Sequence, residues 1–159
     1  MSPEVLLVES SLNVAGSVIY TLRKAIPGIA IEYVRTVSQA LDFLFHTGNF
    51  TSQIAEPTPD LMLLSLDLPN EGSIELLRII KAYVRTQKIP IVLLGEASTL
   101  IPRLEKSPLD INRFVVKSGN HEAFMQAIAH AVTCWLDTDA GHSASAGEDN
   151  ASTYTVSER

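Results

Sequence analysis

The stretch PDLMLLSLDLP, residues 59–69, contains the most apolar strand candidate in this chain. Within it, residues 61–64 are continuously apolar and lack the alternation of a strand that water wets on one face. Continuous runs of this kind are typical of strands that are covered on both faces in a parallel sheet. We therefore expect residues 60–66 to form the centre of such a sheet.

On both sides of this segment, short apolar runs alternate with helical patterns. The other strand candidates are residues 4–8, 29–34, 89–94 and 113–116. The helix candidates, whose apolar residues recur at steps of three and four, are residues 12–25, 37–45, 74–84 and about 121–136. Thr36 offers an N-cap to the second helix. The pattern is weaker at 97–106, where Pro102 predicts a short or distorted helix.

Five strands that alternate with five helices predict an α/β fold with a doubly wound, five-stranded parallel sheet. Right-handed crossovers then place helices on both faces. We expect one domain over residues 1–136. Residues 137–159 are rich in Ser, Thr, Ala, Gly and acids and have almost no large apolar residue, which predicts a disordered tail.

The composition argues against several classes of protein. The chain has 159 residues, 46% of them hydrophobic, and 18 acidic against 12 basic residues give a formal charge of -6. This sign disfavours nucleic-acid binding. No apolar run approaches the roughly 20 residues of a membrane span, and Glu4 lies where a signal peptide would be basic, so we expect a cytoplasmic protein. The lone cysteine, Cys134, lies in an apolar helical stretch and is expected to be a buried thiol.

Ligands of open parallel sheets bind beyond the carboxyl ends of the strands. The sequence delivers these candidates to that rim: Glu9 and Ser10 after the first strand, Ser65 and Asp67 after the third, Gly95 and Glu96 after the fourth, and Lys117 after the fifth.

Residues 59–69 resemble the segment of response-regulator receiver domains in which an aspartate ends the third strand and a Leu-Pro turn follows. Residues 5–9, 89–94 and 114–117 are similar to other receiver motifs in the same order, so the resemblance covers roughly residues 4–136. It implies a flavodoxin-like receiver fold and a place in two-component or phosphorelay signalling. The long connection before the third strand and the ending at 114–135 look most like stand-alone receivers associated with bacterial phytochromes.

The resemblance also implies which positions would carry receiver chemistry. Receivers hold Mg²⁺ with two acids after the first strand, and accept a phosphoryl group on an aspartate after the third. They have a Ser or Thr after the fourth strand and a lysine after the fifth. The matching residues here are Glu9 and Ser10, then Ser65, Gly95 and Lys117. Only Glu9 and Lys117 keep the family's chemistry, so the site is degenerate.

The substituted residues predict a loss of phosphorylation. Mg²⁺ requires oxygen ligands rich in carboxylates, so binding should be weak or absent, with Glu9 and Asp67 as weak candidate ligands. A serine hydroxyl such as that of Ser65 needs a nearby general base, and no histidine lies near this rim in the sequence. Gly95 has no hydroxyl to report a phosphoryl group to Phe114, at the family's switch aromatic position. We therefore expect no enzymatic activity.

Other interpretations of these residues remain open. Lys117 could pair with Glu9, Asp67 or a backbone carbonyl as a purely structural strut. Asp67 could serve as a substitute acceptor, although receiver geometry would direct its backbone rather than its side chain to the site. His46, His121, His130 and Cys134 match no metal-ligand spacing.

The leading hypothesis is a pseudo-receiver that binds proteins independently of phosphorylation. Its expected partners are a sensor histidine kinase, a phytochrome-type photoreceptor or another response regulator, and a homodimer through the fourth and fifth or first and fifth helices is possible. The first alternative is weak or atypical phosphorylation, at Asp67, at Ser65 or at a serine of the tail. The second is a small-molecule sensor whose ligand is attracted to Lys117.

Overall fold

The computed structural model describes residues 4–45, 58–96, 113–117 and 120–141. Strands and helices alternate along the chain. In order they are β1 (Glu4–Val8), α1 (Leu12–Ala25), β2 (Ala30–Val34), α2 (Val37–Phe45), β3 (Leu61–Ser65), α3 (Gly72–Ala82), β4 (Ile91–Gly95), β5 (Arg113–Val116) and α5 (His121–Gly141).

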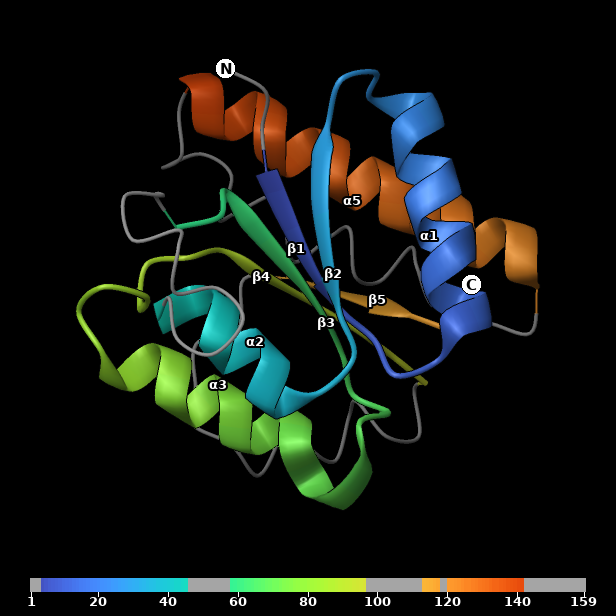
Figure 1. Cartoon of the computed structure of the whole chain (residues 1–159). Coiled ribbons are helices and arrows are strands. Elements are labelled where there is room, and N and C mark those ends of the chain that lie inside the picture. The colour runs from blue at the N-terminus through green and yellow to red at the C-terminus, as the bar shows by residue number, and fades with distance from the viewer. Residues whose placement is uncertain (1–3, 46–57, 97–112, 118–119, 142–159) are drawn as a thin grey trace.

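The five strands form one parallel sheet in the order β2-β1-β3-β4-β5. Helices α1 and α5 cover one face of the sheet, and α2 and α3 cover the other (Figure 1). β3 lies at the centre, between β1 and β4, and all its residues are buried. The predicted doubly wound α/β fold is therefore confirmed.

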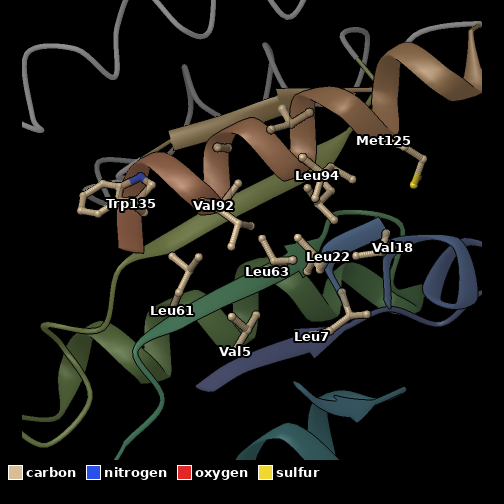
Figure 2. Close-up of a cluster of buried hydrophobic side chains, with 14 of the residues drawn as sticks. Val5, Leu7, Val18, Leu22, Leu61, Leu63, Val92, Leu94, Met125 and Trp135 are labelled. Atoms are coloured by element: carbon tan, nitrogen blue, oxygen red, sulfur yellow. The ribbon is translucent and has the colours of Figure 1, made fainter. Parts of the chain in front are cut away.

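The continuous apolar run of β3 serves two cores at once, because successive side chains of a strand point to opposite faces. Leu61 and Leu63 join the cluster under α1 and α5, which Figure 2 shows together with Val18 and Leu22 of α1. Met62 and Leu64 join the cluster under α2 and α3. The same alternation divides β1, so neither face of the central strands contacts water.

Local signals set several of the element boundaries. The hydroxyl of Ser11 accepts a hydrogen bond from the Val14 N–H at 3.3 Å and caps α1. The turn after β3 contains a 3₁₀ segment, Pro69–Glu71, in which Asn70 has a φ of 59°. Asn is one of the few residues that adopt this left-handed conformation readily.

Several predicted boundaries differ from the structure. The strands predicted at 29–34, 60–66 and 89–94 are Ala30–Val34, Leu61–Ser65 and Ile91–Gly95. α3 begins at Gly72 and ends at Ala82, so it is displaced by two residues from the predicted 74–84. α5 continues to Gly141, five residues beyond the predicted end of the helix at 136. Apolar periodicity missed this turn because residues 137–141 include no large apolar residue. The weak helix at 97–106 and the tail beyond 141 lie outside the described residues.

None of the helices in the described ranges is both long enough and apolar enough to cross a membrane.

Candidate functional site

The carboxyl ends of four adjacent strands bring the predicted site residues to one rim. Ser65 ends β3 and pairs in register with Leu94, while Gly95 ends β4 and pairs with Val116. The Lys117 N–H donates to the Gly95 carbonyl at 2.6 Å. Glu9 and Ser10 follow β1, which lies directly beside β3.

The side chain of Ser65 is buried, and its hydroxyl is hydrogen-bonded to the turn that follows β3. Its Oγ accepts a hydrogen bond from the Asp67 N–H at 3.0 Å. Its backbone carbonyl accepts a hydrogen bond from the Ser73 hydroxyl, at the start of α3. The described histidines, His121 and His130, both lie on α5, and neither is a hydrogen-bond partner of Ser65. Among the described residues, no histidine is therefore in hydrogen-bond contact with Ser65.

Lys117 forms an ion pair with Asp67, one of the three structural partners that the sequence left open. Its Nζ lies 3.1 Å from Asp67 Oδ2 and 5.8 Å from the centre of the Phe124 ring. The side chains of Lys117 and Asp67 are 26% and 41% exposed, so water screens the pair. As predicted, the backbone of Asp67 meets Ser65, but its carboxylate also enters the rim.

Glu9 is buried and directs its side chain to the start of α1. Its Oε2 accepts the Ser11 N–H at 2.9 Å, and its backbone carbonyl accepts the Tyr33 hydroxyl at 2.8 Å. Burial is the largest cause that raises the pKa of Tyr33, against the opposing charge of Arg35. Tyr33 therefore stays protonated at neutral pH and can donate this hydrogen bond.

Arg35 and Tyr33, both outside the receiver motifs, are contacts that sequence analysis missed. Arg35 donates from its guanidinium to the Ser10 carbonyl at 3.0 Å. Both residues belong to β2 or directly follow it, and β2 pairs with β1. A prediction of the register between β1 and β2 would have placed these two residues next to Glu9 and Ser10.

Gly95 and Phe114 lie on the neighbouring strands β4 and β5. Phe114 is half-buried and packs against the α2 and α3 cluster, opposite Leu93 in the register. Gly95 contributes only backbone to the rim.

The described residues contain no group of three or more His, Cys, Asp or Glu side chains that could hold a metal ion. On α5, Cys134 is half-buried, with its Sγ 3.5 Å from His130 Nε2. The expectation of a fully buried thiol is therefore wrong, because Cys134 lies toward the solvent side of the helix beside exposed His130. Two side chains one turn apart are too few for a structural metal site.

A cavity of about 570 Å³ lies next to the rim, between the starts of α2 and α3. Its lining includes Ser10, Arg35, Leu68, Asn70 and Glu75, whereas Lys117 and Ser65 do not line it. This cavity is therefore not the ligand pocket at Lys117 that the sequence suggested.

Comparisons with known proteins agree with this fold. No family model matches the chain. The response regulator Rcp1 of Synechocystis sp. is 27% identical over 134 residues, which are 84% of this chain and 89% of that protein. The crystal structure of its Mn²⁺-bound form, 26% identical, covers 86% of this chain and 96% of that one with a TM-score of 0.74.

The phosphorylated cyanobacterial phytochrome response regulator RcpA, 25% identical, covers 87% of this chain and 96% of its own, with a TM-score of 0.77. The predicted relationship to receiver domains, close to the stand-alone receivers of phytochromes, is therefore confirmed. The RcpA structure is that of the phosphorylated protein, and the Rcp1 structure is that of its Mn²⁺-bound form.

Proposed function

We propose that this chain is a receiver-type signalling module of a two-component or phosphorelay pathway that binds its partners without being phosphorylated. The observation that carries the proposal is Ser65 at the end of β3, the position that the resemblance assigns to the receiver's aspartate; its buried hydroxyl accepts the Asp67 N–H. A hydroxyl in this position lacks the charge of a carboxylate, and no described histidine contacts it to activate it.

The remaining rim residues support the same proposal. The Lys117 ammonium is paired with Asp67, and the described side-chain contact of Glu9 is to the Ser11 N–H. Each group therefore has a partner within the chain that does not depend on a phosphoryl group or a metal. With serines at positions 10 and 65, two carboxylates that would compensate Mg²⁺ for its lost water are absent, so we expect weak Mg²⁺ binding or none.

The similarity to Rcp1 and RcpA supports a phytochrome-type photoreceptor, a sensor histidine kinase or another response regulator as the partner. In this role the chain acts as a cytoplasmic binding module and not as an enzyme.

The alternative is a receiver that retains weak phosphorylation on Asp67. It is favoured by one observation, the exposed Asp67 carboxylate 3.1 Å from the Lys117 Nζ, in reach of a phosphodonor from solvent. Its weakness is that the same carboxylate would have to leave its ion pair to attack.

One NMR experiment separates the two functions. Backbone amide signals of the full chain would be followed during titration with Mg²⁺ and then with Mg²⁺ plus beryllofluoride. We expect no saturable change at Ser65, Gly95 or Lys117 in the native chain. The variant Ser10→Asp/Ser65→Asp, which restores both carboxylates, should respond to Mg²⁺ and serves as the positive control.

A saturable response of the native chain that Asp67→Asn abolishes would reject the proposal and establish the alternative. A response that survives Asp67→Asn but is lost in Glu9→Gln would also reject it, and would place the metal at Glu9.

A further inference from the structure

A turn at the far end of α3 displays apolar side chains to solvent. Tyr83 is 54% exposed and Val84 is 83% exposed, two of the few large apolar side chains among the described residues that water reaches so freely. The same stretch of chain carries the exposed cations Arg78, Arg85 and Lys88. We call these five residues the α3 turn patch.

The charge of this region differs from that of the rest of the chain. Residues 76–95 contain no Asp or Glu, although the whole chain carries a formal charge of -6. Arg78, Arg85 and Lys88 have no carboxylate partner among the described residues. Three exposed cations therefore lie in one acid-free stretch of an otherwise acidic chain.

Hydrogen bonds hold the turn in one shape. Thr86 is fully buried, and its hydroxyl donates to the Ile80 carbonyl at 2.7 Å. The N–H groups of Thr86 and Gln87 both donate to the Tyr83 carbonyl, at 3.1 and 2.8 Å. Lys81 Nζ donates to the Gln87 carbonyl at 3.2 Å. The backbone that carries the exposed side chains is thus ordered before any partner arrives, which lowers the entropy lost on binding.

The Tyr83 ring is also fixed by a neighbouring helix. It packs edge-on against Phe45 of α2, with ring centres 5.3 Å apart and an angle of 69° between the planes. Aromatic residues and arginines are the residue types enriched among those that dominate binding energy at protein interfaces. Because its ring is held against α2 and only Val84 accompanies it, the patch lacks the freely inserting apolar face that membrane binding needs.

We propose that the α3 turn patch is a docking surface for an acidic segment of a partner protein, with an apolar side chain that rests on Tyr83 and Val84. This inference rests on the proposed function and deepens it by assigning the surface and the partner's chemistry. The turn lies at the end of the sheet opposite the Ser65 rim (Figure 1), so docking there requires no phosphoryl group.

The test is a selection from a random-peptide phage library on the full chain, without Mg²⁺ or phosphodonor, followed by affinity measurements on the selected peptides. We expect acidic peptides that contain at least one aromatic or aliphatic residue. Arg85→Glu/Lys88→Glu should weaken their binding on the order of tenfold, since it removes two ion pairs and adds repulsion. Val84→Ser, which changes no charge, should weaken it as well.

The chain offers a matched control on α1. There Tyr20 is exposed, and the Lys24 Nζ lies 5.6 Å from the centre of its ring, with Arg23 alongside. Arg23→Glu/Lys24→Glu changes the net charge by the same amount beside a similar aromatic residue. We expect this variant to bind the selected peptides as the native chain does.

The selection is then repeated with Mg²⁺ and beryllofluoride present. Three results would overturn the docking surface: no selected peptides enriched in acids under either condition, equal weakening by both charge reversals, or tighter patch-dependent binding to phosphatidylserine vesicles than to any peptide. If one of these results occurs while the amide signals of Ser65, Gly95 and Lys117 do not change in the NMR titration, the patch is rejected and the proposed function stands. If acidic peptides bind the patch only after beryllofluoride is added, the patch stands and phosphorylation independence is rejected.

Discussion

At position 65 a hydroxyl makes smaller demands on its neighbours than a carboxylate would. A buried carboxylate would require a cation or several donors, whereas the Ser65 hydroxyl accepts the Asp67 N–H. The Asp67 carboxylate and Lys117 form an ion pair with each other at the rim surface. The charges of Lys117 and Asp67 therefore compensate each other within the rim.

The exposure of the Lys117 and Asp67 pair predicts a small energy. Because the two side chains are 26% and 41% exposed, Asp67→Asn should lower the free energy of unfolding by less than about 1 kcal/mol. The loss should shrink at high salt, which screens exposed charges. Urea unfolding at low and high NaCl measures both effects. A loss well above this, insensitive to salt, would mean that the pair is shielded from water.

Glu32 lies on the edge strand β2, where burial raises the pKa of its carboxyl. The Glu32 carboxyl therefore loses its proton at a lower pH in the unfolded chain than in the native one. As pH rises from 4.5, the ordinary pKa, through the raised pKa of the native state, the native state is progressively disfavoured. Glu32→Gln removes this penalty. The variant should be more stable than the native chain at pH 7, and the difference should vanish toward pH 4.

Urea midpoints of both proteins at several pH values provide the measurement. A difference that persists unchanged at pH 4 would show that the gain comes from something other than the proton.

At the scale of the helices, two glycines have opposite roles. Gly16 lies inside α1, and a Cβ there would meet nothing within 4 Å. At Gly72, the first residue of α3, a Cβ would lie 2.7 Å from Val37 Cγ2 of α2. The backbone of Gly72 is ordinary helix, so close approach of the two helices, not conformation, requires glycine.

We expect Gly16→Ala to stabilise the protein by about 0.5–1 kcal/mol, because alanine loses less backbone entropy in a helix. Gly72→Ala should destabilise it by about 1–3 kcal/mol, because α2 and α3 must move apart. Chemical unfolding of both variants measures these two changes in the free energy of unfolding. If Gly72→Ala proved neutral, Val37 could adjust freely and the contact between the helix starts would not be tight.

For the whole molecule, the question is whether the two faces of the sheet unfold together. Leu63 belongs to the α1 and α5 cluster and Leu64 to the α2 and α3 cluster, yet they are neighbours on β3. Truncation of either leucine to Ala should lower the free energy of unfolding by about 2–5 kcal/mol. Because both clusters share the same strands, each variant should still unfold in one transition.

Fluorescence and circular dichroism during urea unfolding test this, with Trp135 as a reporter of the α1 and α5 cluster. Coincident curves for both variants are expected. Separate transitions for the two probes in Leu64→Ala would show that the cores are independent. Leu12→Ala, at an exposed position, is the control and should have little effect.

The sequence by itself determined the fold class, because the evidence for it is local: continuous apolar runs for buried strands and three- and four-residue steps for helices. It likewise placed Ser65, Gly95 and Lys117 at one rim, since the carboxyl ends of parallel strands share an edge. It missed the last turn of α5, because residues 137–141 include no large apolar residue that would continue the pattern.

Only the tertiary structure decided which groups pair. Lys117 and Asp67 are 50 positions apart, and Tyr33 and Glu9 are 24 apart. The sequence offered several partners for Lys117 and none for Tyr33, because such pairings depend on strand register and on the path of the turn after β3. Likewise, the exposure of Tyr83 and Val84 follows from the buried Thr86 that holds their turn, a contact that periodicity does not encode.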